Sequence, residues 1–160
     1  MAQLDKQTYK SSWNPNVAEM ILSYNDDGGG AAGVYTASCI IPAGAYIQDI
    51  QVHTDTLWNA GTSATLIVGD SDDDNGFYAS VNAKATDLVA NEVLSFYHLG
   101  GKGGAYLTDD NGVMTQYSSS ARTITAKMTT VGDASTAGVT RIIVIWVKPT
   151  DSVTGSFEAS

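Results

Sequence analysis

The sequence has few of the side chains that catalysis and export require. Its 160 residues include one cysteine and two histidines. The single cysteine, Cys39, cannot form a disulfide within the chain, and in its apolar surroundings we expect a buried thiol. His53 and His98 belong to no zinc-binding or nucleophile motif. We therefore predict a protein that is not an enzyme and that needs no cofactor.

Basic residues and long apolar runs are also scarce. Eight lysines and arginines stand against seventeen acidic residues, which gives a net charge of -9. This balance argues against nucleic acid as a partner, because phosphate groups attract positive charge. No apolar stretch approaches the roughly 20 residues of a membrane span, and the first residues form no signal core. We expect no membrane partner, and folding in the cytoplasm of whatever cell makes the protein.

The chain does contain a series of short apolar runs separated by glycine, asparagine, aspartate and proline. This pattern is typical of an antiparallel sandwich or barrel, and no long helical period competes with it. We predict an all-β fold, a jelly-roll-like antiparallel β-sandwich of about eight strands, with an immunoglobulin-like sandwich as the alternative. The predicted strands span residues 17–24, 34–41, 46–54, 65–68, 93–99, 105–107, 122–131 and 139–148.

The chain divides into three parts. Residues 1–16 are polar and read as an N-terminal arm, residues 17–150 hold the predicted strands and form the sandwich domain, and residues 151–160 form a C-terminal tail. The first two strands of the sandwich look like a hairpin around the glycine-rich turn at 25–30. Residues 81–91 suit a covering loop or a short helix.

The last predicted strand is apolar on both faces. Alternating strands bury one face and expose the other, so a run such as Ile142–Val147 predicts a central position in its sheet or a place between the core and another subunit. We predict that Ile142, Val144 and Trp146, or their neighbours on the opposite face of the strand, are buried at an oligomer contact.

An acidic loop, residues 70–76, is the one candidate metal site. Carboxylates at alternate positions, here Asp70, Asp72 and Asp74, are how a loop surrounds calcium with oxygen ligands. The spacing does not fit the known calcium loop, because the glycine follows one position late and no glutamate closes the loop. A solvated acidic turn is the better interpretation, with structural calcium as the alternative.

Aromatic side chains raise the alternative of a carbohydrate-binding or adhesin module. Trp58 is the candidate for an exposed platform, because it lies in a loop-like segment of asparagine, alanine and glycine.

Two segments resemble small virion proteins of tailed bacteriophages. The first is PAGAYIQDI at residues 42–50. The second is LWNAGTSATLIVGDSD at residues 57–72, followed by NGF at 75–77, in which an aromatic-Asn-x-Gly-Thr-Ser turn leads into a short strand and a Val-Gly-Asp corner. The resemblance covers residues 42 to about 78. Among these virion proteins, the two segments are most similar to head decoration proteins, also called capsid cement proteins.

The resemblance implies a structural protein on the exterior of the capsid. A β-sandwich of this kind forms trimers or similar homo-oligomers and binds between subunits of the major capsid protein. Another part of the virion, such as a tail, neck or fibre component, is the alternative. In the decoration role, the arm would contact a capsid neighbour. The residues expected to bind partners are Lys6, Tyr9, Lys10 and Trp13 of the arm, together with Trp58.

Overall fold

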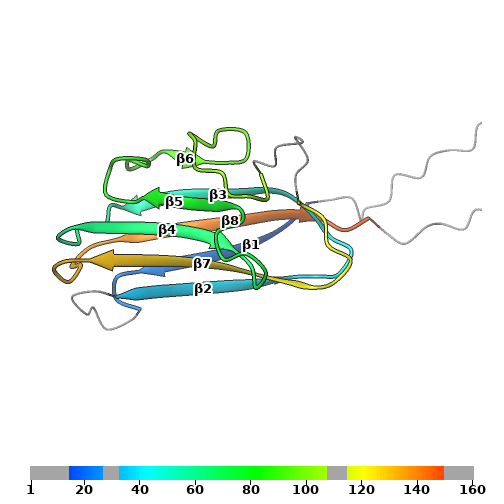
Figure 1. Ribbon diagram of the computed structural model, residues 1–160, viewed down its shortest axis with the longest axis horizontal. Coiled ribbons are helices and arrows are strands. Elements are labelled where there is room, and N and C mark those ends of the chain that lie inside the picture. Colours follow the sequence, from blue (N-terminus) through cyan, green and yellow to red (C-terminus); the bar gives the residue numbers. More distant parts are fainter. Residues whose placement is uncertain (1–14, 27–32, 108–114, 150–160) are drawn as a thin grey trace, which may run out of the picture.

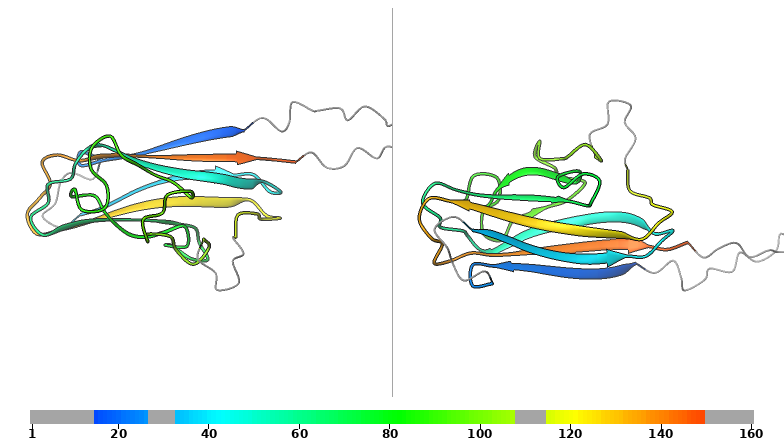
Figure 2. Two further views of the ribbon diagram at one scale, coloured as in Figure 1. Left: turned by 90° about the horizontal axis from the view of Figure 1, so that it is seen from above. Right: turned by 60° about the horizontal axis from the view of Figure 1, so that its bottom comes forward.

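The computed structural model describes residues 15–26, 33–107 and 115–149. Within them, eight strands form two four-stranded antiparallel sheets that face each other across one core (Figures 1 and 2). The predicted all-β sandwich is confirmed. No helix in these ranges is long and apolar enough to cross a membrane. The strands are β1 (Asn16–Ser23), β2 (Val34–Ile41), β3 (Tyr46–Thr56), β4 (Ser63–Gly69), β5 (Tyr78–Asn82), β6 (Val93–Leu94), β7 (Arg122–Val131) and β8 (Val139–Val147).

The strand order is that of a jelly roll. Sheet A has the order β1-β8-β3-β6, and sheet B has the order β2-β7-β4-β5. The chain passes from one sheet to the other at every connection between described strands except that from β4 to β5. This arrangement corresponds to two Greek keys wound together. It places strands that are distant in the sequence next to each other.

The predicted hairpin of the first two strands is wrong. β1 pairs with β8 and β2 pairs with β7, so the two strands lie in opposite sheets. Each strand has one apolar face that must leave water. The sandwich buries both faces by placing them on opposite sides of one core, where Leu22 of β1 and Tyr35 of β2 are almost fully enclosed.

Three other segments differ from the prediction. Residues 78–82 form β5, which was not predicted, and residues 105–107 form a turn instead of a strand. Of the predicted strand at 93–99, only Val93 and Leu94 pair in the sheet, because the chain reverses where the amide of His98 donates to the carbonyl of Ser95 at 3.0 Å. Residues 83–92 are turns and irregular structure, which agrees with the covering loop predicted for most of residues 81–91.

The central position predicted for the last strand is confirmed. β8 lies between β1 and β3 in sheet A. Ile142 and Val144 have no exposed area, because their side chains fill the core of the same chain. The prediction that these two residues form an oligomer contact is therefore wrong. Trp146 is half-buried and packs against the core, and the opposite face of β8 presents Ile143 and Ile145, also half-buried.

Candidate functional site

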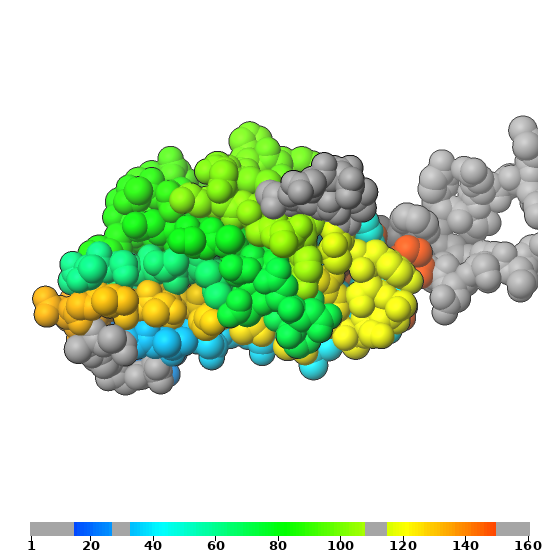
Figure 3. Space-filling model, viewed as in Figure 1, coloured from blue at the N-terminus to red at the C-terminus, as the bar shows by residue number. Residues whose placement is uncertain are grey.

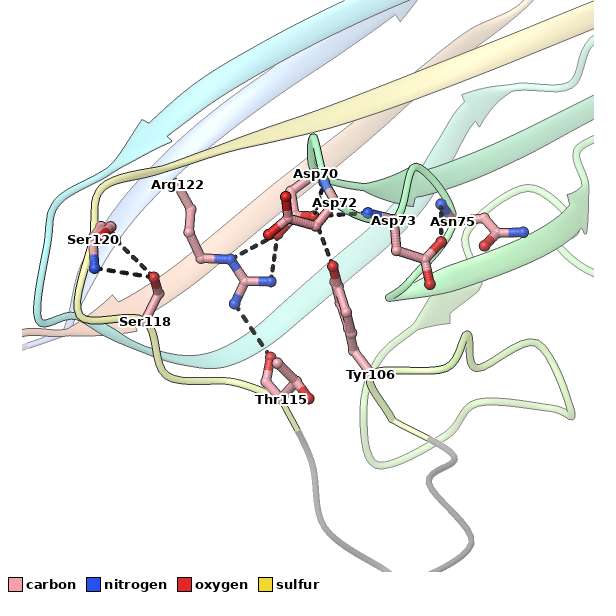
Figure 4. A network of polar contacts seen from close by, with 9 residues as sticks. All are labelled: Asp70, Asp72, Asp73, Asn75, Tyr106, Thr115, Ser118, Ser120 and Arg122. Carbon is pink, nitrogen blue, oxygen red and sulfur yellow. Dashed lines mark hydrogen bonds and ion pairs between the residues drawn. The ribbon is translucent and has the colours of Figure 1, made fainter.

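The acidic loop after β4 closes around a buried ion pair. Asp70 is 8% exposed, and its Oδ2 accepts hydrogen bonds from Nε and Nη2 of Arg122 at 2.9 and 2.6 Å. Arg122 is the first residue of β7. Its guanidinium also lies over the rings of Phe77 and Tyr106, 5.1 Å from each centroid, and donates to the carbonyl of Thr115 (Figure 4). One cation thus joins four segments of the chain.

The second oxygen of Asp70 is also occupied. Oδ1 accepts from the amides of Asp72 and Asp73 at 3.0 and 3.1 Å and from the hydroxyl of Tyr106 at 2.7 Å. Burial opposes ionisation of Asp70, but hydrogen bonds from Tyr106, Arg122 and the two amides outweigh it and lower the pKa below its usual 3.8. Burial, followed by the bond to Asp70, raises the pKa of Tyr106 to about 12.

Two of the three carboxylates considered as calcium ligands, Asp70 and Asp74, are paired with separate cations, and Asp72 is the third. Asp70 is held by Arg122, and Asp74 contacts Lys127 of β7 at 2.7 Å. In the described ranges, no group of three or more His, Cys, Asp or Glu side chains is arranged to hold a metal ion. The loop lies beside residues 115–121 on the surface of the sandwich (Figure 3), and both segments line a depression together with the Asp70–Arg122 pair. The Asp70–Arg122 pair therefore holds the loop against β7, and we call this arrangement the Arg122 clamp.

The predicted partner-binding residues of the arm, Lys6, Tyr9, Lys10 and Trp13, lie outside the described residues. Trp58 is described, and it is only 2% exposed. Its Nε1 donates to Oγ1 of Thr140 at 2.9 Å, and its ring packs against Tyr35. The predicted exposed platform is wrong, because the loop folds over the end of the core and turns the indole inward.

Cys39 has a less enclosed position than expected. The side chain is half-buried on β2 and packs against the core cluster. Burial raises the pKa of the thiol to about 11. The sulfur therefore stays protonated near neutral pH and is a poor nucleophile.

Among the described strands, two sheet edges without a further strand partner run along one side of the sandwich. β1 is the outer strand of sheet A and β2 is the outer strand of sheet B, and they lie side by side (Figure 2). Soluble proteins usually protect such edges with charge or proline, because free backbone groups invite another strand. β2 contains neither, and β1 has one charged residue, Glu19. Val17 of β1 is 61% exposed and Ile40 of β2 is 71% exposed.

Sequence reasoning missed these edges. The period of two shows which face of a strand is apolar, but it does not show which strands end a sheet. One signal was available, since residues 34–41 contain no charged side chain.

A chain of ion pairs crosses the outer face of sheet A. Arg141 of β8 contacts Glu19 of β1 at 2.7 Å and Asp55 of β3 at 2.5 Å, and His53 contacts Asp55 at 2.8 Å. The hydrogen bond to Glu19, followed by that to Asp55, raises the pKa of Arg141 above its usual value. Because these side chains are partly exposed, each pair adds little to stability. The strip joins three neighbouring strands and runs from the β1 edge to His53, which is paired with Val93 of β6.

These features define a jelly-roll protein with a clamped loop on one sheet and two open edges. No protein-family model matches the chain, and no curated protein matches it. Solved structures of similar fold include a chain in the cyanophage Pam1 capsid asymmetric unit, at 17% identity and a TM-score of 0.55, over 92% of this chain and 94% of that chain. Another is a chain in the capsid of Ralstonia phage GP4, at 15% identity and a TM-score of 0.50, over 86% of each chain. At these identities the likeness shows the fold.

The Asp70–Arg122 pair predicts an asymmetric response to mutation. Arg122→Met leaves the Asp70 carboxylate buried without its counter-charge, and we expect a loss of about 3–5 kcal/mol in the free energy of unfolding. Urea denaturation measures it. Lys127→Met, which breaks the more exposed pair with Asp74, is the matched control and should cost less than about 1 kcal/mol.

A double variant separates two effects: the loss of the attraction between Asp70 and Arg122, and the burial of the Asp70 carboxylate without a counter-charge. Asp70→Asn combined with Arg122→Met removes both charges, so it should be more stable than Arg122→Met alone. Equal stability of Arg122→Met and Lys127→Met would show that the pair does not hold the loop.

Acid should weaken the protein through Asp70. A carboxyl whose pKa is lower in the folded state than its unfolded value of 3.8 binds fewer protons when folded, so its contribution is present above that value and is lost as pH falls through the folded pKa. We expect the free energy of unfolding to decrease more steeply for the native protein than for Asp70→Asn below about pH 4. Urea midpoints from about pH 6 to about pH 3 test this. Parallel curves for the two proteins would refute it.

Proposed function

We propose that the protein is a non-enzymatic component of a tailed-phage capsid, which decorates the exterior of the head and stabilises it by binding between subunits of the major capsid protein. The observation that carries this function is the fold similarity, over nearly the whole chain, to chains of two phage capsids. The resemblance of residues 42 to about 78 to virion proteins supports it independently.

A rigid body suits this role. A protein that holds neighbouring subunits together transmits force between its contacts, so its own strands must not slide. The two sheets share one core, and the Arg122 clamp joins the start of β7 to the loop after β4. Binding then needs only contact surfaces, and the chain offers a candidate arm and two open edges.

The arm is the proposed contact with the shell. Residues 1–16 hold two of the three lysines in the first hundred residues, Lys6 and Lys10, together with Tyr9 and Trp13. Aromatic anchors next to cationic groups are the side chains that dominate many protein interfaces.

The open edges are the proposed contact between copies of the protein. A strand edge without charge or proline, flanked by exposed apolar side chains, is favourable to bury. β2 has this character, β1 differs from it by the single charge of Glu19, and the two strands lie on the same side. We propose that the β1 edge of one copy meets the β2 edge of the next, which is a contact between two different surfaces, and that three such contacts close into a ring.

Deleting residues 1–14 should abolish binding to heads without unfolding the sandwich, because no described strand loses a residue. Co-sedimentation with phage heads that lack the protein measures binding, which should saturate at a fixed copy number for the full chain. A chain lacking residues 150–160 is the control and should still bind. Undiminished binding of the chain without its arm would contradict the arm's role, and binding of the full chain to tails instead of heads would contradict the capsid role.

A charge placed on the open edge should dissociate the oligomer. Ile40→Lys puts an ammonium group on the exposed face of β2, and we expect the mass from light scattering to fall toward the 16.8 kDa of one chain. Val93→Lys adds the same charge on β6, the outer strand at the opposite edge of sheet A, and should leave the mass unchanged. The circular dichroism spectra of both variants should match the native spectrum. A native protein that is monomeric at micromolar concentration would contradict self-association through this edge.

A further inference from the structure

A depression opens on the outer face of sheet A, displaced along the strands from the ion-pair strip toward the start of β3 and the end of β8. It has a volume of about 610 Å³ and lies where β3 and β8 meet the segment after β6. The lining side chains used below are Tyr46, Gln48, Asp49, Tyr97, Gln116 and Ile145.

A break in the strand register forms this surface. Ile47 pairs with Trp146 and Asp49 with Ile145, so Gln48 is an extra residue in β3. In a regular strand, Gln48 and Asp49 would point to opposite faces. The bulge brings both to the depression, as bulges near functional sites often do.

The polar groups of the depression are held in place. Asp49 is 6% exposed, and its carboxylate accepts from the amide of Phe96 at 2.9 Å and from Gln51 at 3.2 Å. The hydroxyl of Tyr46 donates to Oε1 of Gln116 at 2.5 Å. Within the described residues, the amide of Gln48 makes no hydrogen bond to the protein, so both its donor and its acceptor can serve a ligand.

A flat aromatic ring stands beside these groups. Tyr97 is 80% exposed, the highest value among the large apolar and aromatic side chains of the described residues. An exposed ring is costly to keep in water and gains by covering the apolar face of a ligand. A ring next to fixed amide and carboxylate groups matches a molecule that has C–H groups on one face and hydroxyls around its rim.

We propose that this depression binds neutral hexopyranose units of a glycan, with Tyr97 stacked on the sugar face and Gln48 and Asp49 bonded to hydroxyl groups. No basic residue lines the depression, and the chain carries a net charge of -9, so an anionic sugar would be repelled. This function is separate from capsid binding, because it uses the β3–β6 side of sheet A and neither the arm nor the open edges.

The test is titration of the full-length protein with neutral oligosaccharides of glucose, galactose and mannose, and with sialylated lactose as the anionic probe, followed by NMR or calorimetry. At least one neutral probe should bind, and Tyr97→Ala should weaken binding about fivefold or more through loss of ring contact. Tyr97→Phe keeps the ring and should stay close to the native affinity. Tyr117→Ala removes an exposed tyrosine outside the depression and should have no effect.

Binding to none of the neutral probes would overturn this inference, as would preference for the sialylated probe or unchanged affinity in Tyr97→Ala. Because the side chain of Tyr97 is mostly exposed, its variants should retain the native thermal midpoint. Tyr97→Ala should also bind heads as the native chain does, so a failed glycan result leaves the capsid role untouched. A Tyr97→Ala protein that loses both activities would show that the two surfaces are one, and would overturn the separate glycan site.

Discussion

The buried ion pair between Asp70 and Arg122 ties the loop after β4 to the start of β7 in sheet B. Two charges withdrawn from water are tolerated only where hydrogen bonds satisfy nearly all of their donors and acceptors. Here those partners come from the loop after β4, from Tyr106 and from Thr115, so the pair forms only when all three segments reach their final positions. The clamp also requires β4 and β7 to be in their native register. A single-residue slip between these strands would move Arg122 away from the carboxylate.

The sequence allowed the fold class to be predicted because strand patterns are local. Alternation in residues 122–131 marks a half-buried strand, and the doubly apolar run at 142–147 marks a central one; both are present as β7 and β8. The pairing of strands is not local. Nothing in residues 17–24 indicates that their partners lie more than a hundred residues later, so the first two strands were taken as a hairpin.

The same limit applies to the candidate site. Four aspartates in seven residues read as an acidic turn or a calcium loop, because the arginine that binds the first of them lies 52 positions away. The sequence around Trp58 predicted an exposed loop residue. In the structure its indole donates to Thr140, which lies 82 positions later, and its ring is enclosed by the core. Nothing in the sequence around Tyr97 indicated that its side chain is exposed. Its exposure depends on the reversal of the chain after β6, which the apolar pattern of 93–99 conceals.

The winding of the jelly roll has a consequence for synthesis on the ribosome. Asn16 is paired with Trp146, and Ile41 with Arg122, so neither sheet can close before nearly the entire chain has been translated. Topologies dominated by distant pairings fold slowly, and the emerging apolar strands remain open to chaperones and to neighbouring nascent chains. A chain of this topology that is translated in many copies at once would meet this hazard in crowded polysomes. Folding after release then favours a sequence with a strong net negative charge, which keeps incomplete chains apart.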